Sequence, residues 1–483
     1  LQGLRQYPDD KRFALELAGV AYRKKDMGEA KKRLREALQL DPADAYGNDF
    51  LGTLYLLEDN LPAALKYWNR IGKPLVQTMQ LTPVPELEEV LRERTITVSP
   101  GQVFTLDRLR TTESNLDRLG VFTGYRFDLA PRQDGRFDLT FQSVPKAQPL
   151  RGWPGRILPL VRGLPYQAIH FDRYNLGKRA ANLTSLWRWD ADKRRIALDF
   201  SAPFRLNPRS RYRLLLDARD EDWDLRTTYR GEPGGLDHVL LQKVEAGAEM
   251  EFGLTGKLQW TTGLRVAWRR FRNADGSRFF ADGWSFHQRN GLDYRLLSWP
   301  ERRIQVDASA LLRTGRVLTG SPSKFASIEG SLNGKWFPQP EGENVSVEVR
   351  MRAGRTFGPS PLDELFILGM ERDNDLWLRG HTGTRDGHKG SGPLGREYTL
   401  FQSEVNRTLF EFAFLRLQAG PFFDTGRIAD PSGQFGSRGW MQDAGLQAKI
   451  RTLGGVTWTF VYGRDLRDGR GVFYTAVSSR FSR

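Results

Sequence analysis

The chain has 483 residues, which is enough for two or three domains, and it contains no cysteine. Disulfides and cysteine-ligated metal sites are therefore excluded, and the lack of thiols suits a protein exported through an oxidising compartment. The net charge of +15 raises the question of nucleic-acid binding. Because the arginines are spread over polar strand positions and do not cluster on one face, we expect no nucleic-acid partner.

Residues 1–73 carry a repeat of helical character. Equivalent residues stand 34 positions apart, namely Pro8 and Pro42, Leu17 and Leu51, and Ala30 and Ala64. Two helix pairs are predicted, over 10–24 and 27–40 and then over 44–57 and 61–71. A helix-turn-helix period of 34 residues with small residues at the crossings resembles the tetratricopeptide repeat. A generic helical hairpin is the alternative. The resemblance implies a scaffold that binds a protein partner.

Residues 74–147 read as an α+β module. A strand over 75–81 and helices over 85–94 and 105–119 precede two strands, over 125–129 and 137–144. The last two strands are joined at Asp134-Gly135, a strong hairpin signal. The Pro100-Gly101-Gln-Val-Phe104 start of the second helix and its Leu119-Gly-Val-Phe122 exit resemble the POTRA module of outer-membrane assembly proteins. A soluble α+β module of another kind is the alternative.

Residues 163–483 alternate between apolar and polar positions, which is typical of strands with one apolar face. In 345–353 every odd position is apolar and every even position is polar. About sixteen such segments with ~10-residue spans suit an antiparallel transmembrane β-barrel. We expect Trp260, Val266 and Val347 to face lipid, and Arg265 and Arg350 to face the lumen. Tryptophans near segment ends favour the membrane over a soluble sandwich or propeller.

Two motifs in this region point to a site inside the barrel. Leu378-Arg379-Gly380-His381 precedes a polar, glycine-rich stretch that ends at Gly395, and Phe422-Phe-Asp424-Thr-Gly426 follows on a strand. An arginine buried without a partner is costly, so Arg379 needs a carboxylate. Strands are predicted over 397–407 and 410–426, and their inward faces offer Glu404 and Asp424. A guanidinium can bind a carboxylate through two hydrogen bonds.

Together these features resemble the superfamily typified by BamA, TamA and the two-partner secretion transporters. Its members carry an Arg-Gly-aromatic tip on a long loop folded into a 16-stranded barrel, opposite a Phe-x-Asp-x-Gly strand; His381 stands here in the aromatic place. The resemblance implies a lumenal loop tip and a group of wall partners. It also implies a seam that joins about 166–174 to the last strand. The site residues are Leu378, Arg379, Gly380 and His381 in the tip, Glu404, Phe422, Asp424 and Gly426 in the wall, and Phe473, Val477 and Phe481 in the last strand.

The function implied by the resemblance is to insert a protein client into the Gram-negative outer membrane or to pass one across it, without nucleotide. The N-terminal modules would lie in the periplasm and capture the client or a partner. Two alternatives remain, a pore dedicated to one secreted partner and a structural or lipid-handling barrel within a larger complex. No catalytic set or phosphate-binding loop stands out, so no enzyme activity and no cofactor are expected. Around His381 the sequence offers no second histidine or carboxylate at ligand spacing, so no metal is expected there.

Overall fold

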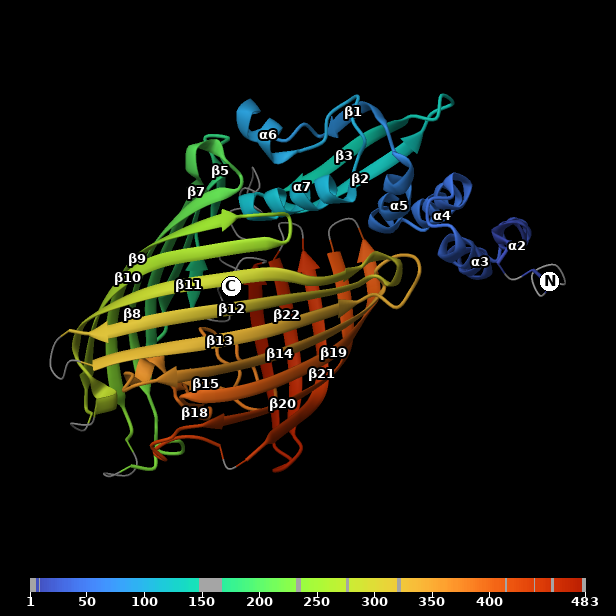
Figure 1. The fold of residues 1–483 in the computed structure, drawn as a ribbon. Helices are drawn as coiled ribbons and strands as arrows, with labels where there is room; N and C mark the ends of the chain where they lie inside the picture. Colours follow the sequence, from blue (N-terminus) through green and yellow to red (C-terminus); the bar gives the residue numbers. More distant parts are fainter. Residues whose placement is uncertain are drawn as a thin grey trace.

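The structure is a computed structural model that describes residues 6–7, 9–146, 167–231, 236–274, 278–318, 323–412, 415–437, 439–452 and 456–479. A closed β-barrel carries an α+β module across one mouth, and a group of helices extends sideways from that module (Figure 1). Among the described residues, none of the helices combines the length and the apolar character needed to cross a membrane.

Four helices form the N-terminal region. They are α2 (Lys11–Arg23), α3 (Met27–Leu40), α4 (Ala45–Leu57) and α5 (Leu61–Trp68), and the 3₁₀ turn η1 (Asn69–Ile71) follows. Each helix starts after an Asp or Asn whose side chain accepts a hydrogen bond from a backbone N–H of the first turn, which is the usual N-cap arrangement. The capping residues are Asp10, Asp26, Asp44 and Asn60. The helices coincide with the predicted ones apart from their ends, whereas their identity as tetratricopeptide repeats stays a prediction.

The helices and the α+β module share one hydrophobic core. Trp68 at the end of α5 is buried, and its ring centroid lies 5.1 Å from that of Phe137 in the module. Gly52 on α4 makes room for this indole, because a Cβ there would lie 2.5 Å from Trp68 Cδ1. The predicted boundary near residue 73 is therefore crossed by packing contacts, and the domain limits 1–73 and 74–147 stay predictions.

The α+β module contains β1 (Val76–Thr82), α6 (Glu89–Thr95), α7 (Leu106–Leu119), β2 (Phe122–Pro131) and β3 (Phe137–Pro145). Its sheet has the order β1-β3-β2, with β1 parallel and β2 antiparallel to β3. Thr105 caps α7 through its side chain, and Gly120 ends the helix with φ 65°, a conformation that favours glycine. The predicted strand–helix–helix–strand–strand order is present; the assignment as a POTRA module stays a prediction.

The barrel wall is an antiparallel meander. Its strands are β4 (Ala168–His170), β5 (Arg173–Leu176), β6 (Ala181–Trp189), β7 (Lys193–Pro203), β8 (Ser210–Trp223), β9 (Val239–Gly253), β10 (Leu258–Arg272), β11 (Gly283–Trp299), β12 (Ile304–Val317), β13 (Ser323–Trp336), β14 (Val345–Phe357), β19 (Glu397–Phe412), β20 (Leu415–Ala429), β21 (Met441–Thr452), β22 (Val456–Asp465) and β23 (Gly471–Ser479). In ring order β23 lies next to β4, so the first and last wall strands meet at a seam.

The predicted count of sixteen strands is not confirmed. Over the described ranges the closed sheet contains eighteen strands, two of which, β16 (Thr384–Arg385) and β17 (His388–Lys389), are two-residue strands inside the barrel. β4 and β5 both pair with β6 and are pieces of one interrupted strand. A strand predicted over 410–426 is wrong in its first part, because Phe410 to Phe412 end β19 and a bulge between Thr408 and Phe410 shifts the alternation there.

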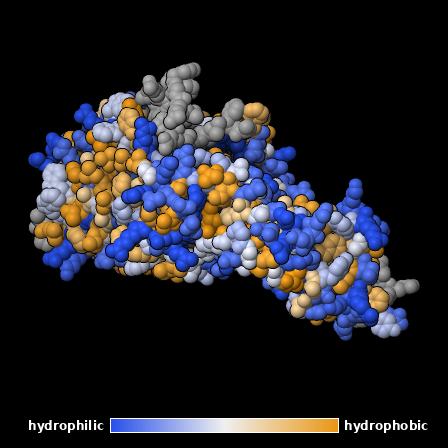
Figure 2. All heavy atoms as spheres, turned by 90° about the horizontal axis from the view of Figure 1, so that it is seen from above, coloured by the Kyte–Doolittle hydropathy of each residue, from blue (hydrophilic) through white to orange (hydrophobic). Residues whose placement is uncertain are grey.

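The two faces of the wall differ in chemistry. Apolar side chains gather over the side of the barrel in Figure 2. On the apolar face of β10, Trp260 and Val266 are 38% and 42% exposed. The inner face carries charges that pair across strands. For example, Arg265 donates to Glu245 at 2.8 Å and to Glu249 at 2.5 Å. An apolar outer band around a polar interior is the pattern of a barrel surrounded by lipid.

The N-terminal region is docked on the barrel through the turn between β11 and β12, the 3₁₀ element η5 (Pro300–Arg302). Asn60 donates to the carbonyl of Pro300 at 2.9 Å, and Lys66 pairs with Glu301 at 2.5 Å. Three strands along the wall from β11, the buried guanidinium of Arg211 on β8 donates to the carbonyl of Leu119 at the end of α7, at 2.7 Å. Both N-terminal parts therefore sit on turns of the same barrel mouth.

Candidate functional site

The residues 358–396 between β14 and β19 form an inner segment, the name used for them below. The segment begins with η6 (Leu362–Glu364) and contains β15 (Phe366–Ile367), β16, β17 and β18 (Leu394–Gly395). β15 pairs with β18, and β16 and β17 form a small hairpin. Lys389 of β17 pairs in parallel with Trp223 of β8, a wall strand on a different side of the barrel from β14 and β19. The segment therefore reaches across the lumen.

Arg379, at the tip of the inner segment, is held by three adjacent wall strands. Its Nη2 and Nε donate to the two carboxylate oxygens of Asp424 at 2.6 and 2.8 Å, the two-pronged geometry that suits a guanidinium. Its Nη1 donates to Glu404 at 2.8 Å and to Gln447 at 2.9 Å. Arg379 is 4% exposed and Asp424 is 0% exposed. The ion pair expected from the sequence is present, and the functional role of the tip stays a prediction.

Apolar contacts fix the tip beside this ion pair. The guanidinium carbon of Arg379 lies 3.9 Å from the ring centroid of Phe422, a cation–π contact inside the barrel. Leu378 is fully buried in a cluster with Leu368 of the inner segment and with residues of β19, β20 and β21. At Gly426 a Cβ would come within 3.2 Å of Leu368, so the absence of a side chain lets the segment approach β20 closely.

Gly380 and His381 contact two aspartates, one on β21 and one on β22. The backbone N–H of Gly380 donates to Asp443. The imidazole of His381 lies between Asp443, at 3.2 Å from Nδ1, and Asp465, at 3.4 Å from Nε2. The expectation that no carboxylate stands near His381 is therefore wrong. Both aspartates lie more than sixty residues along the chain, and only the closed barrel brings them to the tip.

A second set of contacts, missed by the sequence analysis, ties the acidic part of the inner segment to basic wall residues. Every partner is mostly buried, and the pairs reach wall strands β6 to β10 on the side away from Arg379. They join Asp363 and Glu364 to Lys243 and Arg269, Glu371 to Lys193, and Asp373 to Arg188 and Arg195. In this set, Nη1 of Arg195 lies 2.5 Å from Oδ1 of Asp373.

A lysine of the segment also pairs with the wall on this side: Nζ of Lys389 lies 3.3 Å from the carboxylate of Glu221 on β8. The acidic residues of the segment and the basic residues on polar strand faces were both visible in the sequence. Their pairing was not, since Lys193 and Glu371 are separated by 178 positions. The segment is thus bound on opposite sides of the lumen, by its arginine on one side and its acids on the other, an arrangement that can hold a plug in place.

The last wall strand was also predicted to carry site residues. Phe473 pairs with Tyr462 of β22 and is exposed on the outer face, and Val477 pairs with Trp458. Phe481 and the start of the predicted first seam strand, Tyr166, lie outside the described residues. The last strand does contact the inner segment beside the tip, because the ring of Tyr474 lies with its centroid 5.9 Å from that of Trp377.

Comparison with solved structures places the barrel among known folds. CdiB from Escherichia coli matches with 14% identity and a TM-score of 0.51, over 84% of this chain and 75% of that chain. BamA from Haemophilus ducreyi lacking POTRA domains 1–3 matches with 12% identity and a TM-score of 0.46, over 83% of each chain. CdiB from Acinetobacter baumannii matches with 10% identity and a TM-score of 0.43, over 83% and 73%.

No family model and no curated protein matches the sequence. At 14% identity the likeness to CdiB from Escherichia coli concerns the fold alone. The chain therefore has a barrel fold similar to that of CdiB.

Proposed function

We propose that this chain is a Gram-negative outer-membrane barrel that transports protein, either by inserting a client into the membrane or by passing one across it. The proposal rests on the inner segment. Residues 358–396 are bound to both sides of the lumen by ion pairs and hydrogen bonds, and in this position they close a transport path. The path would open when these contacts break. The single observation that carries it is the set of hydrogen bonds that Arg379 donates to the wall residues Asp424, Glu404 and Gln447.

The finer parts of the proposal concern the N-terminal arm. We infer that α2 to α5 are tetratricopeptide-like and bind a protein partner, and that β1 to β3 with α6 and α7 form a POTRA-like module facing the periplasm. β2 is an edge strand of its sheet, so an extended client can add a strand beside it. Capture by strand addition requires no nucleotide. A wall of sixteen strands belongs to the same proposal, because bacterial single-chain outer-membrane barrels have an even number of strands. The described ranges contain fifteen wall strands when β4 and β5 are counted as one.

The function is tested by reconstituting the full chain in liposomes and adding several unrelated outer-membrane barrel proteins unfolded in urea. A general insertase speeds the folding of all of them, as measured by their shift to the compact form in unheated gels. A transporter dedicated to one secreted protein speeds none, but it copurifies with one partner from native membranes. A barrel that does neither is structural, and that result would overturn the proposal.

A further inference from the structure

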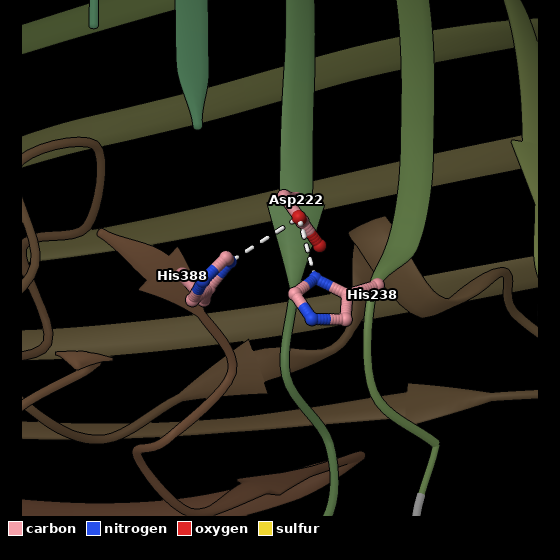
Figure 3. A group of neighbouring side chains, drawn as sticks. All are labelled: Asp222, His238 and His388. Carbon is pink, nitrogen blue, oxygen red and sulfur yellow. Dashed lines mark hydrogen bonds and ion pairs between the residues drawn. The ribbon is translucent and has the colours of Figure 1, made fainter. Parts of the chain in front are cut away.

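Two histidines and one aspartate converge at the barrel end opposite the N-terminal arm. Asp222 stands near the end of β8, and His238 directly precedes β9. His388 lies on β17 of the inner segment, where the pairing of its neighbour Lys389 with Trp223 brings it beside Asp222. Figure 3 shows both imidazole rings turned toward the carboxylate. The Nδ1 atoms of His238 and His388 lie 3.0 and 3.2 Å from the same oxygen, Oδ2 of Asp222.

Hydrogen bonding within the chain accounts for only one half of this arrangement, because Nδ1 of His238 shares a hydrogen bond with Oδ2 of Asp222. Nδ1 of His388 is buried without a hydrogen-bond partner although it lies close to Asp222, and Oδ1 of Asp222 is likewise buried without one. The two rings meet edge to face, with centroids 5.1 Å apart. Two protonated imidazoles at this separation would repel each other. Two neutral imidazoles would each present a nitrogen lone pair, which is the form in which histidine binds metals.

The spacing of the three groups fits a tetrahedral ion. Their ligand atoms all lie within 4.8 Å of one another. With Zn–N and Zn–O bonds of about 2.1 Å, the ligands of a tetrahedral zinc ion stand about 3.4 Å apart. The two histidine–aspartate separations are only slightly shorter. Imidazole and carboxylate ligands suit zinc and its first-row neighbours better than calcium or magnesium, which prefer oxygen.

The backbone around the three residues is positioned by contacts of its own. His238 adopts φ 54°, in the left-handed region, and its carbonyl accepts from Asn273 at 3.2 Å. The N–H of Asp224 donates to the carbonyl of Lys389 at 2.8 Å, which fixes β17 against the end of β8. Unusual backbone conformations of this kind are often found at ligand sites. The ligand set therefore stands on three chain segments whose mutual positions are already fixed.

We propose that Asp222, His238 and His388 bind a divalent transition-metal ion of the zinc type, with water in the fourth position. The ion would tie the inner segment to β8 and β9, on the side of the barrel away from Arg379. The segment would then have a third anchor that depends on metal supply. The metal site stands on local geometry and does not depend on the transport proposed above.

The test titrates Zn²⁺ into the purified, chelator-treated full chain in detergent and follows binding by calorimetry. We expect one ion per chain, and Co²⁺ at the same site should give the visible absorption of tetrahedral coordination. His238→Ala and His388→Ala should each weaken Zn²⁺ binding by more than about 100-fold, since they remove a direct ligand and even outer-shell changes cost about 10–100-fold. His238 is in an exposed loop, so its variant tests the site even if His388→Ala fails to fold.

The matched control is His381→Ala. His381 lies with Asp443 and Asp465 in a second cluster of possible metal ligands. This variant should leave the affinity for Zn²⁺ unchanged. The proposal is overturned if the wild-type chain binds no Zn²⁺, if the double variant His238→Ala/His388→Ala still binds one ion, or if only His381→Ala abolishes binding. Folding of every variant is checked by its compact form in unheated gels.

Discussion

Arg379 is bonded to three wall strands at once, through Glu404 on β19, Asp424 on β20 and Gln447 on β21. Few side chains can replace it, because only a guanidinium presents several donors in a rigid fork. Lysine would keep the charge but could not bind both oxygens of Asp424 and reach Glu404 in the same geometry.

Arg379→Ala is expected to free the tip while the wall stays folded. It leaves Asp424 buried without its partner, and breaking such a pair costs about 3–5 kcal/mol. Trypsin should then cut the inner segment of the folded protein much faster than in the wild type, and Arg379→Lys should lie between the two. Arg355→Ala is the control, since Arg355 is exposed and its ion pair with Glu397 is long, at 3.9 Å. Equal cleavage of Arg379→Ala and wild type would show that Arg379 does not anchor the segment.

Gly380→Ala tests how closely the tip fits the wall. A Cβ at this position would lie 2.6 Å from Asp443 and 2.8 Å from the backbone nitrogen of Asp465, so the tip must move away. We expect the same gain in trypsin cleavage as for Arg379→Ala, with the charge pair still available. Gly330→Ala on β13 is the control, because its nearest neighbour would be 3.9 Å away. A Gly380→Ala protein as resistant as the wild type would mean that the tip has room.

At the same scale, the sequence indicated one contact and missed others for a physical reason. Arg379 and Asp424 could be paired because the tip motif and the strand motif each leave one charge without a local partner. The pairs of Asp373 with Arg188 and of Lys193 with Glu371 could not, because many charges on the polar strand faces were equivalent candidates. Barrel closure and register select among them, and neither is encoded in any short stretch of chain.

At the scale of elements, the helices were the most predictable part. Their N-caps and period are local signals, and α3 begins and ends where the repeat placed it, at Met27 and Leu40. The strand predicted over 410–426 failed because the bulge between Thr408 and Phe410 reverses the faces of β19. Alternation alone cannot show a bulge, since it looks like a new strand with opposite phase.

The faces of β13 are tested by a pair of substitutions to arginine. Ile328 is 52% exposed on the outer face, and Ser331, three positions away, faces inward and hydrogen-bonds Ser309 at 2.7 Å. An arginine facing lipid near the midplane costs about 2–4 kcal/mol, whereas the inner face already holds charges. Ile328→Arg should therefore lower the folding stability in lipid bilayers, measured by urea titration, far more than Ser331→Arg. Equal losses would contradict the assignment of the faces.

The contact between α7 and the barrel should depend on pH through Glu113. Burial and the nearby Asp117 raise the pKa of Glu113 to about 7, against the opposing effect of Arg295 on β11 and Arg110. A carboxyl whose pKa is raised on folding favours the folded state below its ordinary pKa, and this contribution is lost as pH rises through about 7. We expect the midpoint temperature of the first thermal unfolding transition of the full chain to decrease as the pH is raised from 5 to 8.

Glu113→Gln separates this effect from other titrations. Glutamine cannot ionise, so the variant should lose much of the fall between pH 5 and pH 8 and be more stable than the wild type at pH 8. An unchanged pH dependence in the variant would assign the effect to other groups. Glu93→Gln, in α6 of the same module, is the matched control and should retain the wild-type dependence.

At the scale of the whole molecule, the N-terminal arm, the barrel and the inner segment form a sequence of connected parts. The arm sits on one mouth through Lys66 and Glu301, and the inner segment is bonded to opposite sides of the lumen. Under the proposed transport function, a client delivered at the arm would meet the segment before it could cross. The fold class and the order of the parts were predictable from alternation and repeats. The closure of the barrel around an ion-paired segment was not, because it requires contacts between residues far apart in the chain.

Single-channel conductance in planar bilayers tests most directly the central claim that the lumen is a passage held shut by the inner segment. The full chain is compared with a variant in which residues 371–391 are replaced by a short glycine–serine linker. The replacement removes the tip together with Glu371 and Asp373, and it keeps η6, β15, β18 and the wall. The account predicts a small conductance with rare openings for the full chain, and a large, steady conductance for the variant. Equal conductances for two folded proteins would contradict it.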